Sequence, residues 1–179
     1  RASIEGWLTL DATRKLLAQA GQDFDALKKQ ALTRDFRPVP LKLRASFGIR
    51  NTMRTIESKN VLARLEGSDP QLRDEYVVYT AHWDHLGEGA PVRGDKIYNG
   101  ALDNASGVAS VLEIARGFTT VMPRPKRSIL FLMIGAEEQG LLGSQHYAEQ
   151  PIYPLAKTLA NINFDGINQW GRTKDITVI

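Results

Sequence analysis

The stretch YVVYTAHWDHLG, which spans Tyr76–Gly87, contains the strongest indication of the fold. Its first six residues are mostly apolar and rich in types that favour strands, and the run ends abruptly at His82. A strand that is apolar on both faces is typical of the centre of a sheet with helices on both sides. The stretch therefore predicts a buried central strand that delivers polar side chains at its carboxyl end.

The later run Ser128–Ala136 (SILFLMIGA) has the same character, and Leu159–Ile167 (LANINFDGI) is predicted to form a third core strand. Between the three strands, the sequence predicts helices over residues 107–118 and 141–150. The apolar face of the first helix is expected to comprise Val108, Val111, Leu112, Ala115 and Phe118. This alternation of strand and helix predicts an α/β fold, a three-layer αβα sandwich with a mixed, centrally parallel sheet and right-handed crossovers.

The first 67 residues have a different pattern. Helices are predicted over residues 9–21, with Thr9 or Asp11 as the N-cap, and over residues 23–32. Partial alternation of apolar and polar residues between positions 41 and 67 predicts two strands that pair with each other in antiparallel fashion.

The composition limits the possible partners. The 179 residues are 42% hydrophobic and 24% charged with a net charge of +3, as in many globular domains. The basic residues are scattered, so no nucleic-acid partner is expected, and no apolar run approaches the roughly 20 residues of a membrane span. Because cysteine is absent, a metal site would need histidine and carboxylate ligands. The chain starts at Arg1 and ends in DITVI, so we expect a fragment whose sheet is incomplete at the C-terminus.

Polar side chains follow each of the three apolar strands: His82 after the first, Glu137 and Glu138 after the second, and Asp165 after the third. Asp103 precedes the first helix and is expected at the same edge, where open α/β sheets bind ligands. Each residue has an ordinary alternative role, such as a helix cap or a turn. Together, however, carboxylates this close would repel one another unless a cation is bound. The set therefore predicts a pair of divalent metal ions, and its donors suit zinc.

The chain has three histidines, and two of them lie in the opening stretch. His82 and Asp84 face the same side of an extended segment. Asp84 is therefore placed either to accept the second ring N–H of His82 or to form the turn after the strand. His85 is expected to point away from the site, and His146 is expected to be solvated on a helix.

Glu137 and Glu138 are adjacent, so one is expected to bind metal and the other to act as a general base. Two metal ions lower the pKa of a water molecule and hold it beside a substrate oxygen. A neighbouring glutamate can take a proton from that water and return it to a leaving amine. This chemistry is the hydrolysis of an amide.

Four motifs, in this order along the chain, closely resemble the co-catalytic di-zinc exopeptidases typified by bacterial leucyl aminopeptidases: AHWDHLG, NGALDNASGVA, GAEEQGLLGS and NFDGI. The resemblance runs from about Asn60 to the end of the chain. It implies two zinc ions per complete catalytic domain, a peptide substrate and an exported protein.

The resemblance also implies a role for six residues: His82 and Asp165 as ligands of one zinc, Glu138 as a ligand of the other, Asp103 as the bridge between them, Glu137 as the general base and Asp84 as the orienting partner of His82. The family often has a cis peptide bond after its bridging aspartate, which is the Asp103–Asn104 bond here.

Two regions qualify the resemblance. Residues 1–37 resemble the tail of a protease-associated insert, and residues 38–179 resemble the N-terminal part of the catalytic domain. The family supplies a last histidine to the second zinc from beyond Asp165, whereas no histidine follows His146 here. Either the chain is cut before that residue, which its mid-strand ending favours, or it is a degenerate member of the family. We therefore expect this chain by itself to bind metal weakly at Glu138 and to have little activity, which calorimetric titration with zinc would test.

The function expected from the resemblance is that of a zinc-dependent aminopeptidase. A carboxypeptidase or dipeptidase of the same family is an alternative, as is a non-catalytic receptor or binding module of the same fold. The zinc content of the full-length protein and its activity on a panel of aminoacyl-anilides would separate these alternatives.

Overall fold

The structure is a computed structural model that describes residues 6–172 and residue 174. The chain divides into two compact units, Arg1–Arg54 and Thr55–Ile179, and each is described by itself. The boundary expected after residue 37 stays a prediction. Among the described residues, no helix combines the length and the apolar character that a membrane span needs.

The first unit contains the two predicted helices, α1 (Leu10–Gln19) and α2 (Phe24–Gln30). The side chains of Thr9 and Asp23 cap them by accepting a hydrogen bond from the backbone N–H three residues further on, at 3.3 and 2.7 Å. Both helices are therefore confirmed, each slightly shorter than expected.

The antiparallel pair predicted between positions 41 and 67 is wrong. Residues 42–59 are exposed and contain no strand. The only strand of this region is β1 (Val61–Leu65), and it pairs antiparallel with β5 (Ser128–Ile134). Local alternation in the sequence could not show this, because the partner of β1 lies more than sixty residues away along the chain.

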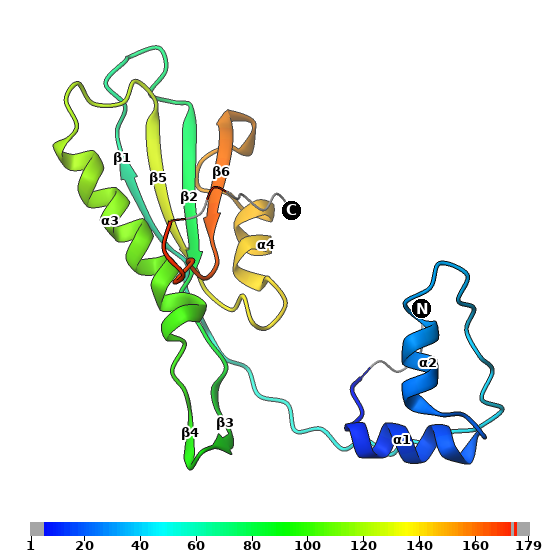
Figure 1. The fold of residues 1–179 in the computed structure, drawn as a ribbon. Helices are drawn as coiled ribbons and strands as arrows, with labels where there is room; N and C mark the ends of the chain where they lie inside the picture. The colour runs from blue at the N-terminus through cyan, green and yellow to red at the C-terminus, as the bar shows by residue number, and fades with distance from the viewer. Residues whose placement is uncertain (1–5, 173, 175–179) are drawn as a thin grey trace. The chain divides into compact units, whose positions relative to one another are not determined.

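The second unit is built on a four-stranded sheet with the order β1-β5-β2-β6 (Figure 1). Strand β2 (Tyr76–His82) pairs parallel with β5 on one side and with β6 (Thr158–Phe164) on the other. The three predicted core strands are thus confirmed as parallel neighbours, with β1 as the antiparallel edge strand.

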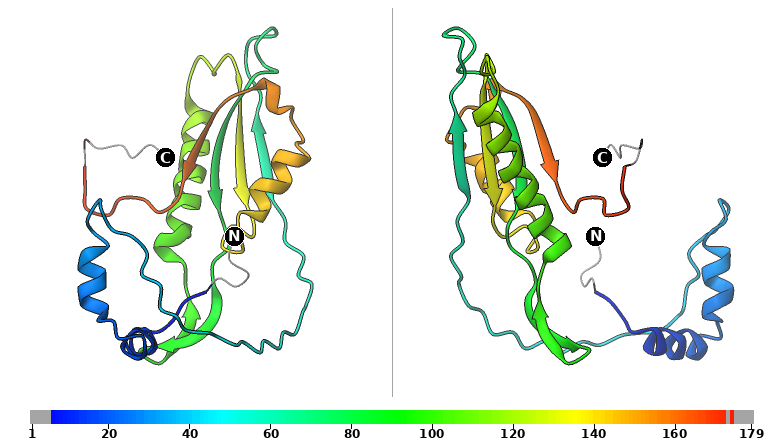
Figure 2. Two further views of the ribbon diagram at one scale, coloured as in Figure 1. Left: turned by 90° about the vertical axis from the view of Figure 1, so that its right-hand side faces the viewer. Right: turned by 60° about the vertical axis from the view of Figure 1, so that its left-hand side comes forward.

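Helices cover both faces of this sheet (Figure 2). Helix α3 (Ser106–Thr120) follows a short turn, η1 (Ala101–Ala105), and packs on one face. Helix α4 (Leu142–Glu149) covers the other face, and the short 3₁₀ turn η2 (Leu155–Lys157) leads into β6. The predicted three-layer αβα architecture is therefore confirmed.

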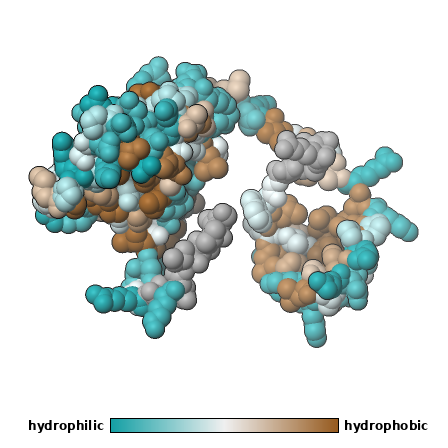
Figure 3. All heavy atoms as spheres, turned by 90° about the horizontal axis from the view of Figure 1, so that it is seen from above, coloured by the Kyte–Doolittle hydropathy of each residue, from teal (hydrophilic) through white to brown (hydrophobic). Residues whose placement is uncertain are grey.

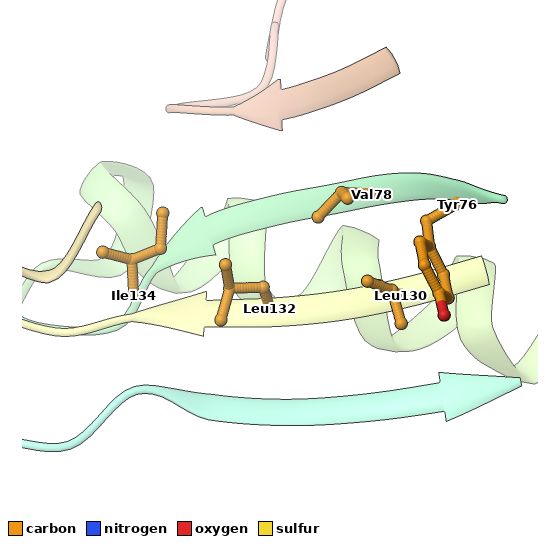
Figure 4. Close-up of a cluster of buried hydrophobic side chains, with 5 residues drawn as sticks. All are labelled: Tyr76, Val78, Leu130, Leu132 and Ile134. Carbon is orange, nitrogen blue, oxygen red and sulfur yellow. The ribbon is translucent and has the colours of Figure 1, made fainter. Parts of the chain in front are cut away.

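The sheet side chains alternate between two cores, as the period of a strand requires. On the α4 side, one core consists of Tyr76, Val78, Leu130, Leu132 and Ile134 (Figure 4). On the α3 side, the buried residues are Ala81, Val111, Ile129 and Phe131. Strand β5 contributes to both cores, which explains why its sequence is apolar without interruption.

The predicted apolar face of α3 is wrong at Leu112, whose side chain is 58% exposed. Ile114 packs against the core instead, together with Val108, Val111, Ala115 and Phe118. The helical repeat explains the difference. Ile114 lies three residues beyond the fully buried Val111 and so on the same side of the helix, whereas Leu112 is rotated by about 100° around the helix axis from Val111.

The sequence did not predict the hairpin formed by β3 (Gly87–Val92) and β4 (Asp95–Tyr98). Its two-residue turn places Arg93 and Gly94 at φ 53° and 88°, the positive values that a tight hairpin of this type requires. The Arg93-Gly94 pair was the available signal. Strand β3 is exposed along its whole length, so it lacks the apolar alternation that marks a half-buried strand.

Both units leave apolar side chains on their surfaces (Figure 3). Strand β6 is an example, since Leu159 and Ile162 are 54% and 40% exposed. Within the described part of the chain, β6 pairs only with β2, so its outer edge carries free backbone groups.

Truncation of the central core residue Leu130 is expected to destabilise the second unit by about 2–5 kcal/mol. Leu130 is 0% exposed, so Leu130→Ala would remove a fully packed side chain and leave a cavity. Urea unfolding would measure the loss. The matched control is Leu112→Ala on the exposed side of α3, which is expected to change stability by less than about 0.5 kcal/mol. Equal effects of the two substitutions would contradict this packing.

Candidate metal centre

The three core strands end side by side at one edge of the sheet. His82 of β2 is in register with Ile134 of β5, and Ala81 of β2 is in register with Phe164 of β6. The residues that follow β5 and β6 therefore lie beside His82. The sheet topology brings the expected polar side chains to one place.

The first cluster of possible metal ligands comprises His82, Asp103 and Asp165. The Nε2 atom of His82 lies 3.1 Å from Oδ1 of Asp103 and 3.3 Å from Oδ1 of Asp165. Two ligand atoms bound tetrahedrally to one zinc at about 2.0–2.1 Å are themselves about 3.3 Å apart. The spacing of this cluster therefore fits a shared zinc ion.

The ring of His82 is held in the tautomer that metal binding needs. His82 is 3% exposed, and its Nδ1–H donates a hydrogen bond to the backbone carbonyl of Asp84 at 3.0 Å. A carbonyl oxygen can only accept, so Nδ1 carries a proton, and in the neutral ring Nε2 is the nitrogen that is left to bind a metal ion. Burial alone would lower the pKa of His82, but the hydrogen bonds to the carbonyl of Asp84 and to the carboxylate of Asp165, together with the charges of Glu137 and Asp165, outweigh burial and raise the pKa.

Asp84 lies beside His82, but its contacts differ from those expected. The carboxylate is 3.8 Å from the Nδ1 atom of His82, and the backbone carbonyl of Asp84 takes the hydrogen bond in its place. The carboxylate instead accepts the backbone N–H groups of Glu137 and Glu138, at 3.0 and 3.2 Å. Asp84 thus orients His82 through its main chain and fixes the turn after β5 through its side chain.

A second cluster comprises His85, Asp103 and Glu138. The expectation that His85 points away is wrong, because its Nδ1 atom lies 2.8 Å from Oε1 of Glu138. Strand β2 ends at His82, so the alternation of an extended chain no longer governs the direction of His85. His146 lies exposed on α4 and belongs to neither cluster.

Glu137 lies at the edge of the first cluster, with Oε2 3.9 Å from Nε2 of His82. Burial raises the pKa of Glu137; the charges of Asp165, Glu138 and Asp84 raise it further, whereas His82 lowers it. A carboxylate with a raised pKa is a stronger base, which suits proton transfer near neutral pH.

Asn104 ties the loop of Asp103 to the end of β6. The peptide bond between Asp103 and Asn104 is cis, as the resemblance implies. The Asn104 side chain is 2% exposed. Its Nδ2 donates a hydrogen bond to the carbonyl of Phe164 at 2.8 Å. Its Oδ1 accepts hydrogen bonds from the backbone N–H groups of Gly107 and Gly166, at 3.1 and 3.0 Å. Sequence reasoning did not find this role, since nothing in the local sequence signals partners sixty residues away.

Comparison with known proteins finds a matching family and similar relatives. The family model described as Peptidase family M28 matches residues 60–179. Aminopeptidase NAALADL1 of Mus musculus is 37% identical over 123 residues, which cover 65% of this chain and 15% of the relative. A probable zinc metalloprotease of Pyrenophora teres f. teres (strain 0-1) is 38% identical over 105 residues, which cover 59% of this chain and 22% of the relative.

A solved structure gives the same result. The Peptidase M28 precursor from Shewanella amazonensis SB2B is 34% identical with a TM-score of 0.50, and the match covers 59% of this chain and 22% of that one. The chain thus spans less than a quarter of the length of each of these three relatives.

Proposed function

Because the chain belongs to peptidase family M28, we propose that it contributes the greater part of the active site of a zinc-dependent exopeptidase, specifically an aminopeptidase. The observation that carries the proposal is the convergence of His82, Asp103 and Asp165 at zinc-ligand spacing, with Glu137 beside them. The relatives support the choice of metal and reaction, since one is named an aminopeptidase and another a probable zinc metalloprotease.

The proposed ligands fall into two groups that share Asp103. His82 and Asp165 would hold one zinc ion and Glu138 the other, with Asp103 between them because it belongs to both clusters. When bound, a zinc pair lowers the pKa of water and polarises the carbonyl of the scissile bond. The donor chemistry fits, because imidazole and carboxylate groups are the ligands that zinc uses in the absence of cysteine.

Glu137 is the proposed general base. Its side chain is 26% exposed, so it is open to a substrate while remaining in a partly desolvated setting. It would take a proton from the attacking water and deliver that proton to the nitrogen of the leaving amine. Asp84 would hold Glu137 in place, because its carboxylate accepts the backbone N–H of Glu137.

Two further proposals concern the whole protein. We propose export, because the Shewanella amazonensis relative is described as a precursor. We also propose that residues 1–37 are the tail of an accessory, protease-associated region, since the family match begins at residue 60.

Removal of metal from the full-length natural protein is expected to lower its hydrolysis of aminoacyl-p-nitroanilides by more than about 100-fold, because zinc contributes several kcal/mol to the transition state. Activity would be measured before and after treatment with 1,10-phenanthroline, with zinc content followed by mass spectrometry, and zinc should restore the rate. The matched control is the same anilide with a blocked amine, which an aminopeptidase should not cleave. Full activity in protein shown to be free of metal would refute the proposal, and cleavage only of substrates with a free carboxylate would indicate a carboxypeptidase.

A further inference from the structure

We infer that His85 is a positioning residue whose imidazole orients the carboxylate of Glu138 for metal binding. The inference rests on the proposed function, because it assigns a partner to one of the proposed zinc ligands. It also gives the two histidines of the AHWDHLG segment different tasks, one as a ligand and the other as a hydrogen-bond donor to a ligand.

The first observation is the contact itself. Nδ1 of His85 lies 2.8 Å from Oε1 of Glu138, within the range of a charge-assisted hydrogen bond. The two side chains are only 21% and 18% exposed, so water does not compete freely for either group. By comparison, the ion pair between Arg14 and Asp25 joins side chains that are 51% and 68% exposed.

The distance separates a partner from a ligand. Two atoms bound to the same zinc lie about 3.3 Å apart, close to the spacings of 3.1 and 3.3 Å from His82 to Asp103 and Asp165. The 2.8 Å spacing from His85 to Glu138 is shorter and corresponds to a direct hydrogen bond. His85 therefore contacts the carboxylate rather than sharing a metal with it.

Glu138 is held from two sides. Its backbone N–H donates to the carboxylate of Asp84 at 3.2 Å, which fixes its main chain. His85 then binds Oε1 of its side chain, and a carboxylate oxygen of Glu138 lies within 4.8 Å of one of Asp103. Without His85, the Glu138 side chain would have no hydrogen-bond partner among the described residues to select one rotamer.

The position of His85 is itself set by the loop that carries Asp103. Gly100 has φ 62°, and a Cβ atom placed there would lie 2.9 Å from Cβ and 3.0 Å from Cγ of His85. The carbonyl of Gly100 also accepts a hydrogen bond from the backbone N–H of Ala105 at 2.9 Å. His85 thus packs directly on the Asp103 loop and connects it to Glu138.

The test is zinc titration of the full-length natural protein by calorimetry, with three variants of His85 that retain or remove the Nδ1 donor. An asparagine amide occupies nearly the position of Nδ1 and cannot replace imidazole as a zinc ligand, whereas a glutamine amide reaches further out. We expect His85→Ala and His85→Gln to weaken the Glu138-dependent zinc site by about 10–100-fold, and His85→Asn to stay within about threefold of the wild type. The matched control is His146→Ala, which removes a histidine outside both clusters and should change nothing.

The outcomes separate a positioning role of His85 from a role as zinc ligand and from no role at the site. Unchanged affinity in both His85→Ala and His85→Gln would overturn the inference. An Asn variant as weak as the Ala variant would also overturn it, because the imidazole would then be a ligand. Urea unfolding of all variants separates loss of the site from loss of the fold, and the Asn–Gln comparison remains decisive even if the Ala variant is unstable. The proposed function fails separately if Glu138→Ala leaves the number of bound zinc ions unchanged.

Discussion

Replacement of Glu137 by glutamine in the full-length natural protein is expected to lower kcat by about 10²–10⁴-fold while zinc binding is retained. The amide has nearly the shape of the carboxylate but cannot accept a proton, so the attacking water would lose its base. The Glu137 carboxylate lies 3.9 Å from Nε2 of His82 and belongs to neither of the two ligand clusters, so the metal content should not change. Steady-state kinetics on aminoacyl-anilides together with zinc analysis would check both parts.

The matched control for this substitution is Glu149→Gln, since Glu149 is an exposed glutamate of α4 whose carboxylate accepts a hydrogen bond from Gln145 of the same helix. It should leave both kcat and zinc content at their wild-type values. Wild-type turnover in the Glu137→Gln variant would show that the base has been assigned to the wrong residue.

Replacement of Asp103 by alanine is expected to have the largest effect on metal binding. Asp103 is the one residue common to both clusters, so its loss removes a ligand from each proposed zinc position. In the full-length natural protein, we expect zinc content to fall from the proposed two ions to less than one, and activity to fall by more than about 100-fold. Equilibrium dialysis with zinc and kinetic assays on the same samples would measure the two effects.

Two further variants test whether the effect of Asp103→Ala comes from the loss of a ligand that both zinc positions share. Asp165→Ala should weaken only the zinc position of His82, because Asp165 belongs to one cluster. Asp95→Ala in the exposed strand β4 should have no effect on zinc content. Two tightly bound zinc ions in the Asp103→Ala variant would exclude the bridging role.

The central part of the fold was predictable because its signals are local and strong. The predominantly apolar runs that form β2 and β5 have few alternatives to a buried parallel strand. Once three such strands were placed in parallel, the rule that their carboxyl ends share an edge brought His82 and Asp165 together without any knowledge of side-chain contacts.

Other features were not predictable because their causes lie far away in the sequence or outside the regular elements. Strand β1 alternates only weakly, and its partner β5 begins more than sixty residues later. His85 lies just beyond the end of β2, where the period of a strand no longer gives the direction of a side chain. The side chain of Asn104 is held by hydrogen bonds to the backbone of Phe164 and Gly166, and no sequence pattern around residue 104 reveals those partners.

Three of the proposed ligands, His82, Glu138 and Asp165, lie at or just beyond the ends of different strands, and His82 and Asp165 are 83 residues apart along the chain. An unfolded chain would hold these two groups far apart on average, so the cluster of His82, Asp103 and Asp165 does not exist before β2 has paired with β6. A bound ion would therefore favour the folded state of the whole sheet over the unfolded chain, by about 4 kcal/mol when free zinc exceeds the dissociation constant a thousandfold. The zinc ions proposed for catalysis would therefore also stabilise the folded state, and the stability of the sheet would depend on the concentration of free metal.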